Sequence, residues 1–189
     1  MAITNNYFKV MYEGNDTKEW DRKYAEWLDK RYLTKGQKVL ELGCGRGEVI
    51  KRLNELGYIA EGCDYPEVNL EKPIPFNSNE YDVIICKNVI EHLRDIFTIT
   101  KEIYRVLKVG GIAIIQTGDS SRDLVGWLQD PTHTTMFTQR RLKNLFLMTN
   151  FKLIKIKSFR NIPYIWRWTT RAFDFTWYPT AIFMGVFQK

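Results

Sequence analysis

The chain has 189 residues, a net charge of +6 and 14% aromatic residues, which is enough for one domain with its own hydrophobic core. No apolar run approaches the roughly 20 residues of a membrane-spanning helix, so no transmembrane segment is expected. The N-terminus has no basic segment followed by an apolar one, so no secretory signal is expected either. The three cysteines, Cys44, Cys63 and Cys86, have no metal-ligand spacing. This predicts reduced thiols, a cytoplasmic protein and no bound metal.

The first half of the chain alternates between helical and strand patterns. Aromatic and apolar residues recur at helical spacing near the N-terminus, and short apolar runs bounded by turn residues are typical of strands. Helices are predicted at 18–32 and 48–57, and strands at 37–43, 58–64 and 81–87. The last of these strands is apolar almost throughout, which indicates burial on both faces of a sheet.

The second half continues the alternation and then changes character. A helix is predicted at 95–111, ended by two glycines, followed by a strand at 112–118 and a helix at 139–150. Two late strands, 151–159 and 180–189, are expected to pair as a hairpin at the sheet edge. The pattern predicts a single α/β domain over 1–189, with a mostly parallel twisted sheet covered by helices on both faces.

Three glycines separate the first predicted strand from the helix that follows it. Gly43, Gly45 and Gly47 fall in "VLELGCGRGEV", where the absence of side chains lets backbone N–H groups approach a ligand. Ligands of open α/β sheets bind at the carboxyl ends of the strands. The residues expected on that rim are Cys44, Arg46, Asp64, Lys87 and Asn88.

The residues around the glycines indicate which ligand binds. A dinucleotide fingerprint would have a third glycine where this chain has Glu48, which argues against a nicotinamide-dependent oxidoreductase. Glu41 ends the first strand with an acid that suits an amine, and Asp64 ends the second strand where it can accept hydrogen bonds from ribose hydroxyls. A ligand with an amine, a carboxylate, a ribose and a base is S-adenosylmethionine.

Four motifs in order extend this interpretation. "VLELGCGRG", "EGCD", "PIPFNSNEYDVIICKNVIEHL" and "EIYRVLKVGGIAIIQT" resemble a class I S-adenosylmethionine-dependent methyltransferase of the compact methyltransferase-domain type, over residues 37–158. The resemblance implies a Rossmann-like fold and that cofactor. It also implies that Gly43, Cys44, Gly45 and Gly47 surround the methionine part, that Glu41 and the backbone after "VIICK" hold its amine, that Arg46 meets its carboxylate and that Asp64 binds the ribose.

The chain departs from the family pattern after the second strand. Only "YPEVNLEKPIPFNSNE" separates Asp64 from Tyr81, so a helix is expected to be missing and a strand to be reduced to a few residues near "VNLE". The adenine contacts are then expected from Asn69 and Leu70, with Tyr65 or Pro66 covering the ring.

The candidate catalytic residues are the two histidines, because an oxygen or nitrogen nucleophile needs a base that titrates near neutral pH. His133, in "DPTHTT" after the fourth strand, is expected to contact the acceptor or remove its proton. For His92 a structural hydrogen bond is favoured over a role as base. If neither histidine acts, positioning alone or an acid such as Asp119 would have to suffice.

The acceptor side is read from charge and aromatic content. Residues 131–173 hold nine Lys or Arg and no acid, and Arg160, Arg167 and Arg171 stand among aromatics there. This favours an anionic small-molecule or glycan acceptor. A nucleic acid, a membrane surface, a plain solvated basic face and a second hydrophobic core remain alternatives, as does a cofactor-binding domain without activity. The predicted parts are a lid at 1–36, a cofactor-binding core at 37–158 and an aromatic and basic cap at 159–189.

Overall fold

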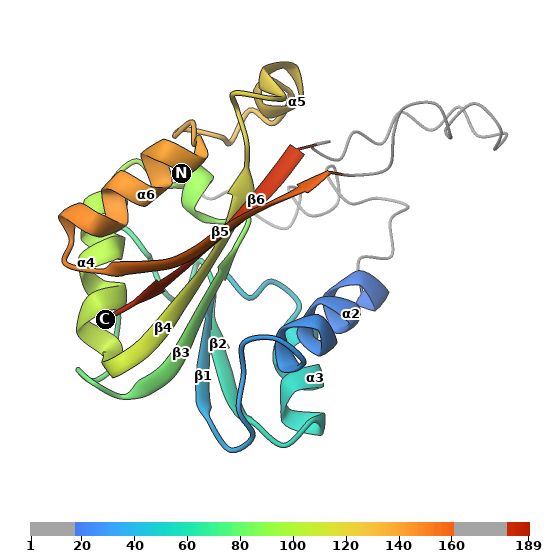
Figure 1. The fold of residues 1–189 in the computed structure, drawn as a ribbon, viewed down its shortest axis with the longest axis vertical. Helices are drawn as coiled ribbons and strands as arrows, with labels where there is room; N and C mark the ends of the chain where they lie inside the picture. The colour runs from blue at the N-terminus through green and yellow to red at the C-terminus, as the bar shows by residue number, and fades with distance from the viewer. Residues whose placement is uncertain (1–17, 161–180) are drawn as a thin grey trace, which may run out of the picture.

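The computed structural model describes residues 18–160 and 181–189 (Figure 1). Within these residues six strands form one sheet in the order β2-β1-β3-β4-β6-β5. The strands are β1 (Lys38–Leu42), β2 (Ile59–Cys63), β3 (Tyr81–Lys87), β4 (Leu107–Gly118), β5 (Lys152–Arg160) and β6 (Ala181–Gln188). The helices are α2 (Lys18–Asp29), α3 (Glu48–Glu55), the 3-10 turn η1 (Ile90–His92), α4 (Ile96–Val106), α5 (Leu124–Gln129) and α6 (Gln139–Met148).

The sheet is parallel through its first four strands and antiparallel at one edge. β1 pairs in parallel with β2 and β3, and β3 pairs in parallel with β4. β6 runs antiparallel to both β4 and β5, which confirms the predicted C-terminal hairpin. The chain leaves β1 for β2 on one side and then crosses to β3 on the other. The carboxyl ends of β1 and β3 therefore form the switch point where ligands of such sheets bind.

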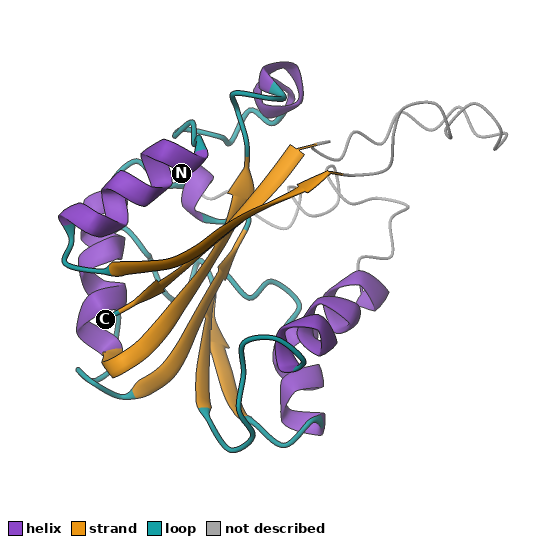
Figure 2. Cartoon of the chain, in the orientation of Figure 1, coloured by secondary structure: helices purple, strands orange, loops and turns teal. Residues whose placement is uncertain are grey.

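Helices cover both faces of the sheet (Figure 2). On one face, α2 and α3 bury Leu28 and Leu53 against Val83, Ile85 and neighbouring strand residues. On the other face, α4 and α6 pack around a second core that includes Ile99, Phe146 and Phe187. The alternation of strand side chains between these two cores is the two-residue period of an extended chain, and it confirms the predicted three-layer α/β architecture.

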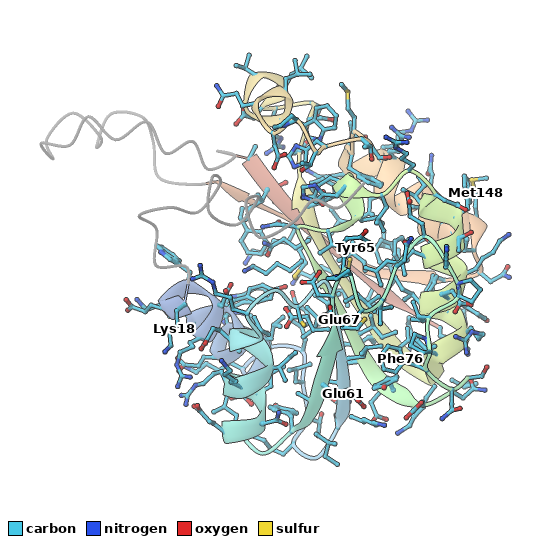
Figure 3. The ribbon with its side chains drawn as sticks, turned by 180° about the vertical axis from the view of Figure 1, so that it is seen from behind. Lys18, Glu61, Tyr65, Glu67, Phe76 and Met148 are labelled. Carbon is cyan, nitrogen blue, oxygen red and sulfur yellow. The ribbon has the colours of Figure 1, made fainter. Side chains whose placement is uncertain are left out.

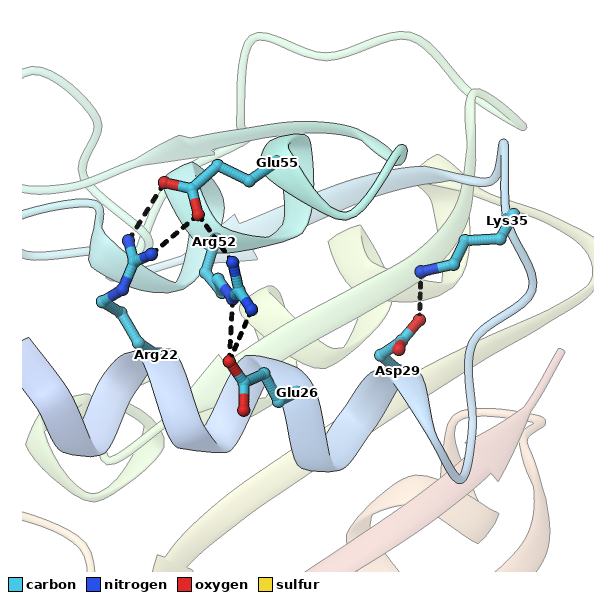
Figure 4. A network of polar contacts seen from close by, with 6 residues as sticks. All are labelled: Arg22, Glu26, Asp29, Lys35, Arg52 and Glu55. Carbon is cyan, nitrogen blue, oxygen red and sulfur yellow. Dashed lines mark hydrogen bonds and ion pairs between the residues drawn. The ribbon is translucent and has the colours of Figure 1, made fainter.

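A network of ion pairs joins α2 to α3 (Figure 4). The Arg22 guanidinium donates to both oxygens of Glu55, at 3.1 and 2.7 Å, and Arg52 donates to Glu26 and to Glu55. Paired arginine–carboxylate geometry fixes the orientation of the two helices more than a single exposed pair would. The network therefore helps to set the position of α2, whose residues Asp21 and Tyr24 reach the site described below.

Three features of the fold differ from the sequence prediction. The helix predicted at 95–111 ends at Val106, because Leu107 turns to an extended conformation with ψ of 140° and is buried in the sheet opposite Tyr81. The two glycines therefore lie within β4, near a register shift between Tyr81 and Val83, and do not cap the helix. The prediction of a short strand near "VNLE" is wrong, because only turns and bends connect β2 to β3. The six-residue α5 was not predicted.

The predicted division of the chain is only partly covered. Residues 1–17 of the expected lid and 161–180 of the expected cap lie outside the described residues. The assignment of 1–36, 37–158 and 159–189 to separate roles stays a prediction.

Candidate active site

The glycine turn after β1 needs its glycines for their backbone conformation. Gly43, Gly45 and Gly47 have φ of 71°, 52° and 71°, the left-handed region in which a side chain is strained. A Cβ on Gly43 would also lie 2.2 Å from a methyl carbon of Val89. The turn after β1 and the segment that leads from β3 into η1 therefore pack directly against each other.

The Asp64 carboxylate is tied to this turn. One oxygen accepts a hydrogen bond from the Gly45 backbone N–H at 2.5 Å, and the other accepts from the Tyr65 N–H at 2.7 Å. The carboxylate keeps lone pairs for further donors, since each oxygen can accept two hydrogen bonds. Asp64 therefore lies where the sequence predicted it, at the end of β2 beside the glycines.

Glu41, on β1, is a buried acid with an unsatisfied oxygen. It is 4% exposed, and its Oε2 has no hydrogen-bond partner among the described residues. Burial raises the pKa of Glu41 to about 8, with Lys87 opposing and Asp21 adding to the rise. Lys87 itself pairs with Asp21 of α2. A cationic amine at Oε2 would supply the missing partner, so Glu41 fits a ligand that carries an ammonium group.

Other predicted cofactor residues lie around the same rim. Cys44 is half-buried beside Gly62, whereas Arg46 is exposed. Asn88 has a left-handed φ of 53°, and its backbone N–H donates to the Gln116 carbonyl. These placements bring the glycine turn, Asp64, Glu41 and the end of β3 together, while the contacts assigned to each side chain stay predictions.

The predicted adenine contacts lie after β2. Tyr65 is 47% exposed, and Figure 3 shows it with Glu67 between the helices of the two faces. The Asn69 side chain accepts a hydrogen bond from the Glu71 N–H, as in an Asx turn. Leu70 is 6% exposed and belongs to the hydrophobic core with Ile74. Of these residues, Tyr65 offers the largest open surface for a flat ring.

A second group of polar residues lies after β3 and α5. The His92 and His133 rings are 4.8 Å apart between centroids, and Trp127 stacks on His133 at 5.2 Å. His133 Nδ1 lies 2.8 Å from the Trp127 carbonyl oxygen, and His92 Nδ1 lies 2.8 Å from Thr132 Oγ1. The two candidate bases, predicted separately from the sequence, therefore form one cluster.

Glu91 completes this cluster and was not predicted as a site residue. It is 3% exposed, and its Oε2 accepts a hydrogen bond from Thr117 Oγ1 at 2.9 Å. Burial raises the pKa of Glu91 to about 7. Burial, together with the neighbouring His133, lowers the pKa of His92 to about 4. A Glu-His pair in a turn gives no sequence signal of its own, because its partner His133 is distant in the chain.

The remaining candidates have other positions. Asp119 is 3% exposed and accepts hydrogen bonds from the Ser121 N–H and hydroxyl, so it is used in the turn after β4. Arg160 is the last residue of β5, opposite Ala181. Arg167 and Arg171 lie outside the described residues.

The fold and this rim define a mostly parallel α/β domain with a ligand-binding glycine turn after the first strand, one acid on that strand and one directly after the second. A family model described as a methyltransferase domain matches residues 12–156, more than half of the chain, and the chain belongs to this family. This confirms the recognition of a class I methyltransferase with S-adenosylmethionine as cofactor.

Curated relatives carry the name ubiquinone biosynthesis O-methyltransferase. Those from Pseudomonas entomophila and Thiobacillus denitrificans are both 25% identical, over 49% and 60% of this chain. The alignments span 49% and 55% of those proteins, so this chain spans about half the length of the curated relatives it matches.

Solved structures share the fold. An S-adenosylmethionine-dependent methyltransferase from Archaeoglobus fulgidus has a TM-score of 0.80 at 17% identity, covering 98% of this chain and 100% of that one. One from Methanosarcina mazei has a TM-score of 0.60 at 18% identity, covering 86% and 96%. Among the described residues, no helix is long and apolar enough to cross a membrane.

Proposed function

We propose that this chain transfers the methyl group of S-adenosylmethionine to an oxygen atom of a small-molecule acceptor held beside His92 and His133. When bound, the cofactor supplies a methyl group activated by a positively charged sulfur. The protein has to align the acceptor oxygen with that methyl group and exclude water. The observation that carries the proposal is the contact of Val89 with Gly43, which joins the cofactor turn to the segment holding Glu91 and His92.

On the cofactor side, each part of S-adenosylmethionine is proposed to bind a particular residue or turn. Glu41 binds the ammonium group, because its Oε2 is buried and lacks a partner among the described residues. Asp64, fixed by Gly45 and Tyr65, accepts the ribose hydroxyls with its remaining lone pairs. The glycine turn admits the methionine part to the backbone, and Tyr65 covers the adenine.

On the acceptor side, His133 is the proposed proton acceptor. Its ring is held by the Trp127 carbonyl at Nδ1 and by stacking on the Trp127 ring, which leaves Nε2 on the opposite edge of the ring. His92 is a weaker candidate, because a pKa of about 4 leaves it a poor base. His92 then holds the loop through Thr132.

The nature of the acceptor has two supports. The curated relatives are named as O-methyltransferases, which favours oxygen as the nucleophile. The nine cations of 131–173, with Arg160, Arg167 and Arg171 among them, favour an anionic small molecule or glycan. The three free cysteines support a reducing, cytoplasmic setting for the reaction.

Methyl transfer into a fractionated cell extract tests the proposal. The protein is incubated with S-adenosylmethionine labelled in the methyl group, and label is counted in small-molecule, glycan, nucleic-acid and protein fractions. We expect label in the small-molecule or glycan fraction with the wild type and little with Asp64→Ala. Label found in the nucleic-acid fraction alone would show that the acceptor is a nucleic acid and not a small molecule. Cofactor binding without transfer to any fraction would indicate a binding domain without activity.

A further inference from the structure

We propose that Glu91, His92 and His133 form a binding site for a divalent transition-metal ion. One ligand atom from each residue lies within 4.8 Å of the others. Two of the residues come from η1 after β3 and the third from the loop after α5. Sequence spacing predicts no bound metal, because metal motifs are recognised by short spacings, whereas this cluster is assembled by the fold.

The hydrogen bonds of the two histidines determine which ring nitrogen carries the hydrogen and which carries the lone pair. The Trp127 carbonyl can only accept, so His133 Nδ1 carries the hydrogen and Nε2 carries the lone pair. Thr132 Oγ1 lies 2.5 Å from Asp130 and donates its hydrogen there, so it accepts from His92 Nδ1. His92 therefore also has its lone pair on Nε2, and a neutral imidazole with that lone pair is the form that binds metals.

The surrounding contacts match those of ligating histidines. Such residues donate their other ring N–H to a carbonyl, a carboxylate or a group bonded to one, as His133 does to Trp127 and His92 does through Thr132 to Asp130. Asp130 lies 3.8 Å from His133 Nε2, too far for a hydrogen bond. Glu91 is held by Thr117, which fixes the carboxylate beside the rings.

The donor set indicates the kind of ion. Two imidazoles and one carboxylate suit zinc and its first-row neighbours better than calcium or magnesium, which prefer oxygen ligands. Ligands about 2.1 Å from a tetrahedral ion lie roughly 3.4 Å apart, so the widest ligand separation, at most 4.8 Å here, would close by up to about 1.4 Å around it.

An ion held by three protein ligands has a coordination position left for the acceptor. An acceptor hydroxyl bound there would have a lowered pKa and would lose its proton to solvent, so that His133 would serve as a ligand and not as the base. This consequence rests on the proposed function, whereas ion binding itself does not require the cofactor or the acceptor. The two proposals can therefore fail separately.

Titration of the purified, chelator-stripped protein with Zn²⁺ and Co²⁺ tests the inference, with neither cofactor nor acceptor present. Calorimetry should give one site of micromolar affinity or tighter, and Co²⁺ should produce the visible absorption of a four- or five-coordinate site. Zn²⁺ should also raise the melting temperature. The double variant His92→Ala with His133→Ala, and separately Glu91→Gln, should weaken binding at least tenfold, whereas Glu67→Gln, which changes an exposed acid outside the cluster, should bind normally.

Two results would overturn the site. One is the absence of Zn²⁺ and Co²⁺ binding by the folded wild type at millimolar ion. The other is unchanged affinity in Glu91→Gln and in the histidine variant, each checked for folding by circular dichroism. If the double variant does not fold, His133→Asn replaces it in the comparison. Methyl transfer that persists in chelator, together with absent ion binding, would leave the proposed function intact and assign the proton to His133.

Discussion

Replacement of Glu41 by Gln should make the protein more stable and a weaker binder of its cofactor. The ordinary pKa of this carboxyl is 4.5, and burial raises it to about 8 in the folded chain. A raised acid pKa means that the folded state binds the proton more tightly than the unfolded state does. The cost of burying Glu41 is therefore smallest below pH 4.5, and the free energy of unfolding falls as the pH rises from about 4.5 to about 8.

The size of this penalty follows from the shift. At pH 7 the unfolded carboxyl is ionised and the folded one is not, which costs about 3 kcal/mol at 1.36 kcal/mol per pKa unit. Glu41→Gln removes the ionisation but leaves a buried amide, so we expect a gain of roughly 1–3 kcal/mol at pH 8 and little gain at pH 5. Urea unfolding at both pH values measures it, with the exposed Glu67→Gln as control.

The same shift predicts that cofactor binding releases a proton. Glu41 must ionise to pair with the ammonium group, so at pH 7 roughly 0.8–0.9 proton should leave the complex, as calorimetry in buffers of different ionisation enthalpy would show. Affinity should rise about twentyfold from pH 6 to pH 8 and fall above that, as the cofactor's own amine loses its proton. Glu41→Gln should bind at least about tenfold more weakly at pH 8 and lose the proton linkage. Equal stability gains at pH 5 and pH 8, with unaltered binding, would refute this reasoning.

Three further outcomes are expected. Asp64→Ala should weaken cofactor binding at least about tenfold by calorimetry, because it removes a charged acceptor and loosens Gly45; unchanged affinity would remove Asp64 from the site. Gly43→Ala should lower the free energy of unfolding by more than the roughly 1–2 kcal/mol of left-handed strain, because the added Cβ would clash with Val89. Gly57→Ala is the control: its Cβ would have no atom within 4 Å, so it should show the strain alone. Arg22→Ala should lower the melting temperature slightly, and the difference should shrink in 1 M salt; a salt-independent loss would argue against the ion pairs.

The sequence predicted those parts of the fold that depend on local patterns. The apolar strands ended close to their predicted bounds, and the turn after β1 was recognised because its glycines are needed for backbone conformation. The end of α4 was mispredicted because Leu107 suits a helix by its neighbours and a strand by its pairing with Tyr81. That choice depends on a residue distant in the sequence, which periodicity does not register.

The site residues also fall into those that local sequence patterns predict and those that depend on distant residues. Glu41 lies near the end of one short strand and Asp64 directly after the next, beside a recognisable turn, so their common location could be inferred before the structure. Glu91 could not be inferred, because its significance comes from His133 and from the Thr117 hydroxyl on another strand. Cys86 lies between the two regions: burial raises the pKa of its thiol, and the charges of Glu91 and Glu41 add to the rise.

Among the described residues, unsatisfied buried polar atoms lie both beside Glu41 and beside His133. Three buried side-chain atoms have no hydrogen-bond partner there: the Tyr24 hydroxyl, Glu41 Oε2 and Trp127 Nε1. Folded proteins leave few such groups unpaired, since each costs about 1–3 kcal/mol. Tyr24 and Glu41 lie where the cofactor's charged end is proposed to bind, and Trp127 stacks on His133. Methyl transfer requires a cofactor and an acceptor side by side, and we propose the cofactor as the partner of Glu41 Oε2 on one side of the Val89–Gly43 contact, with the acceptor on the other side.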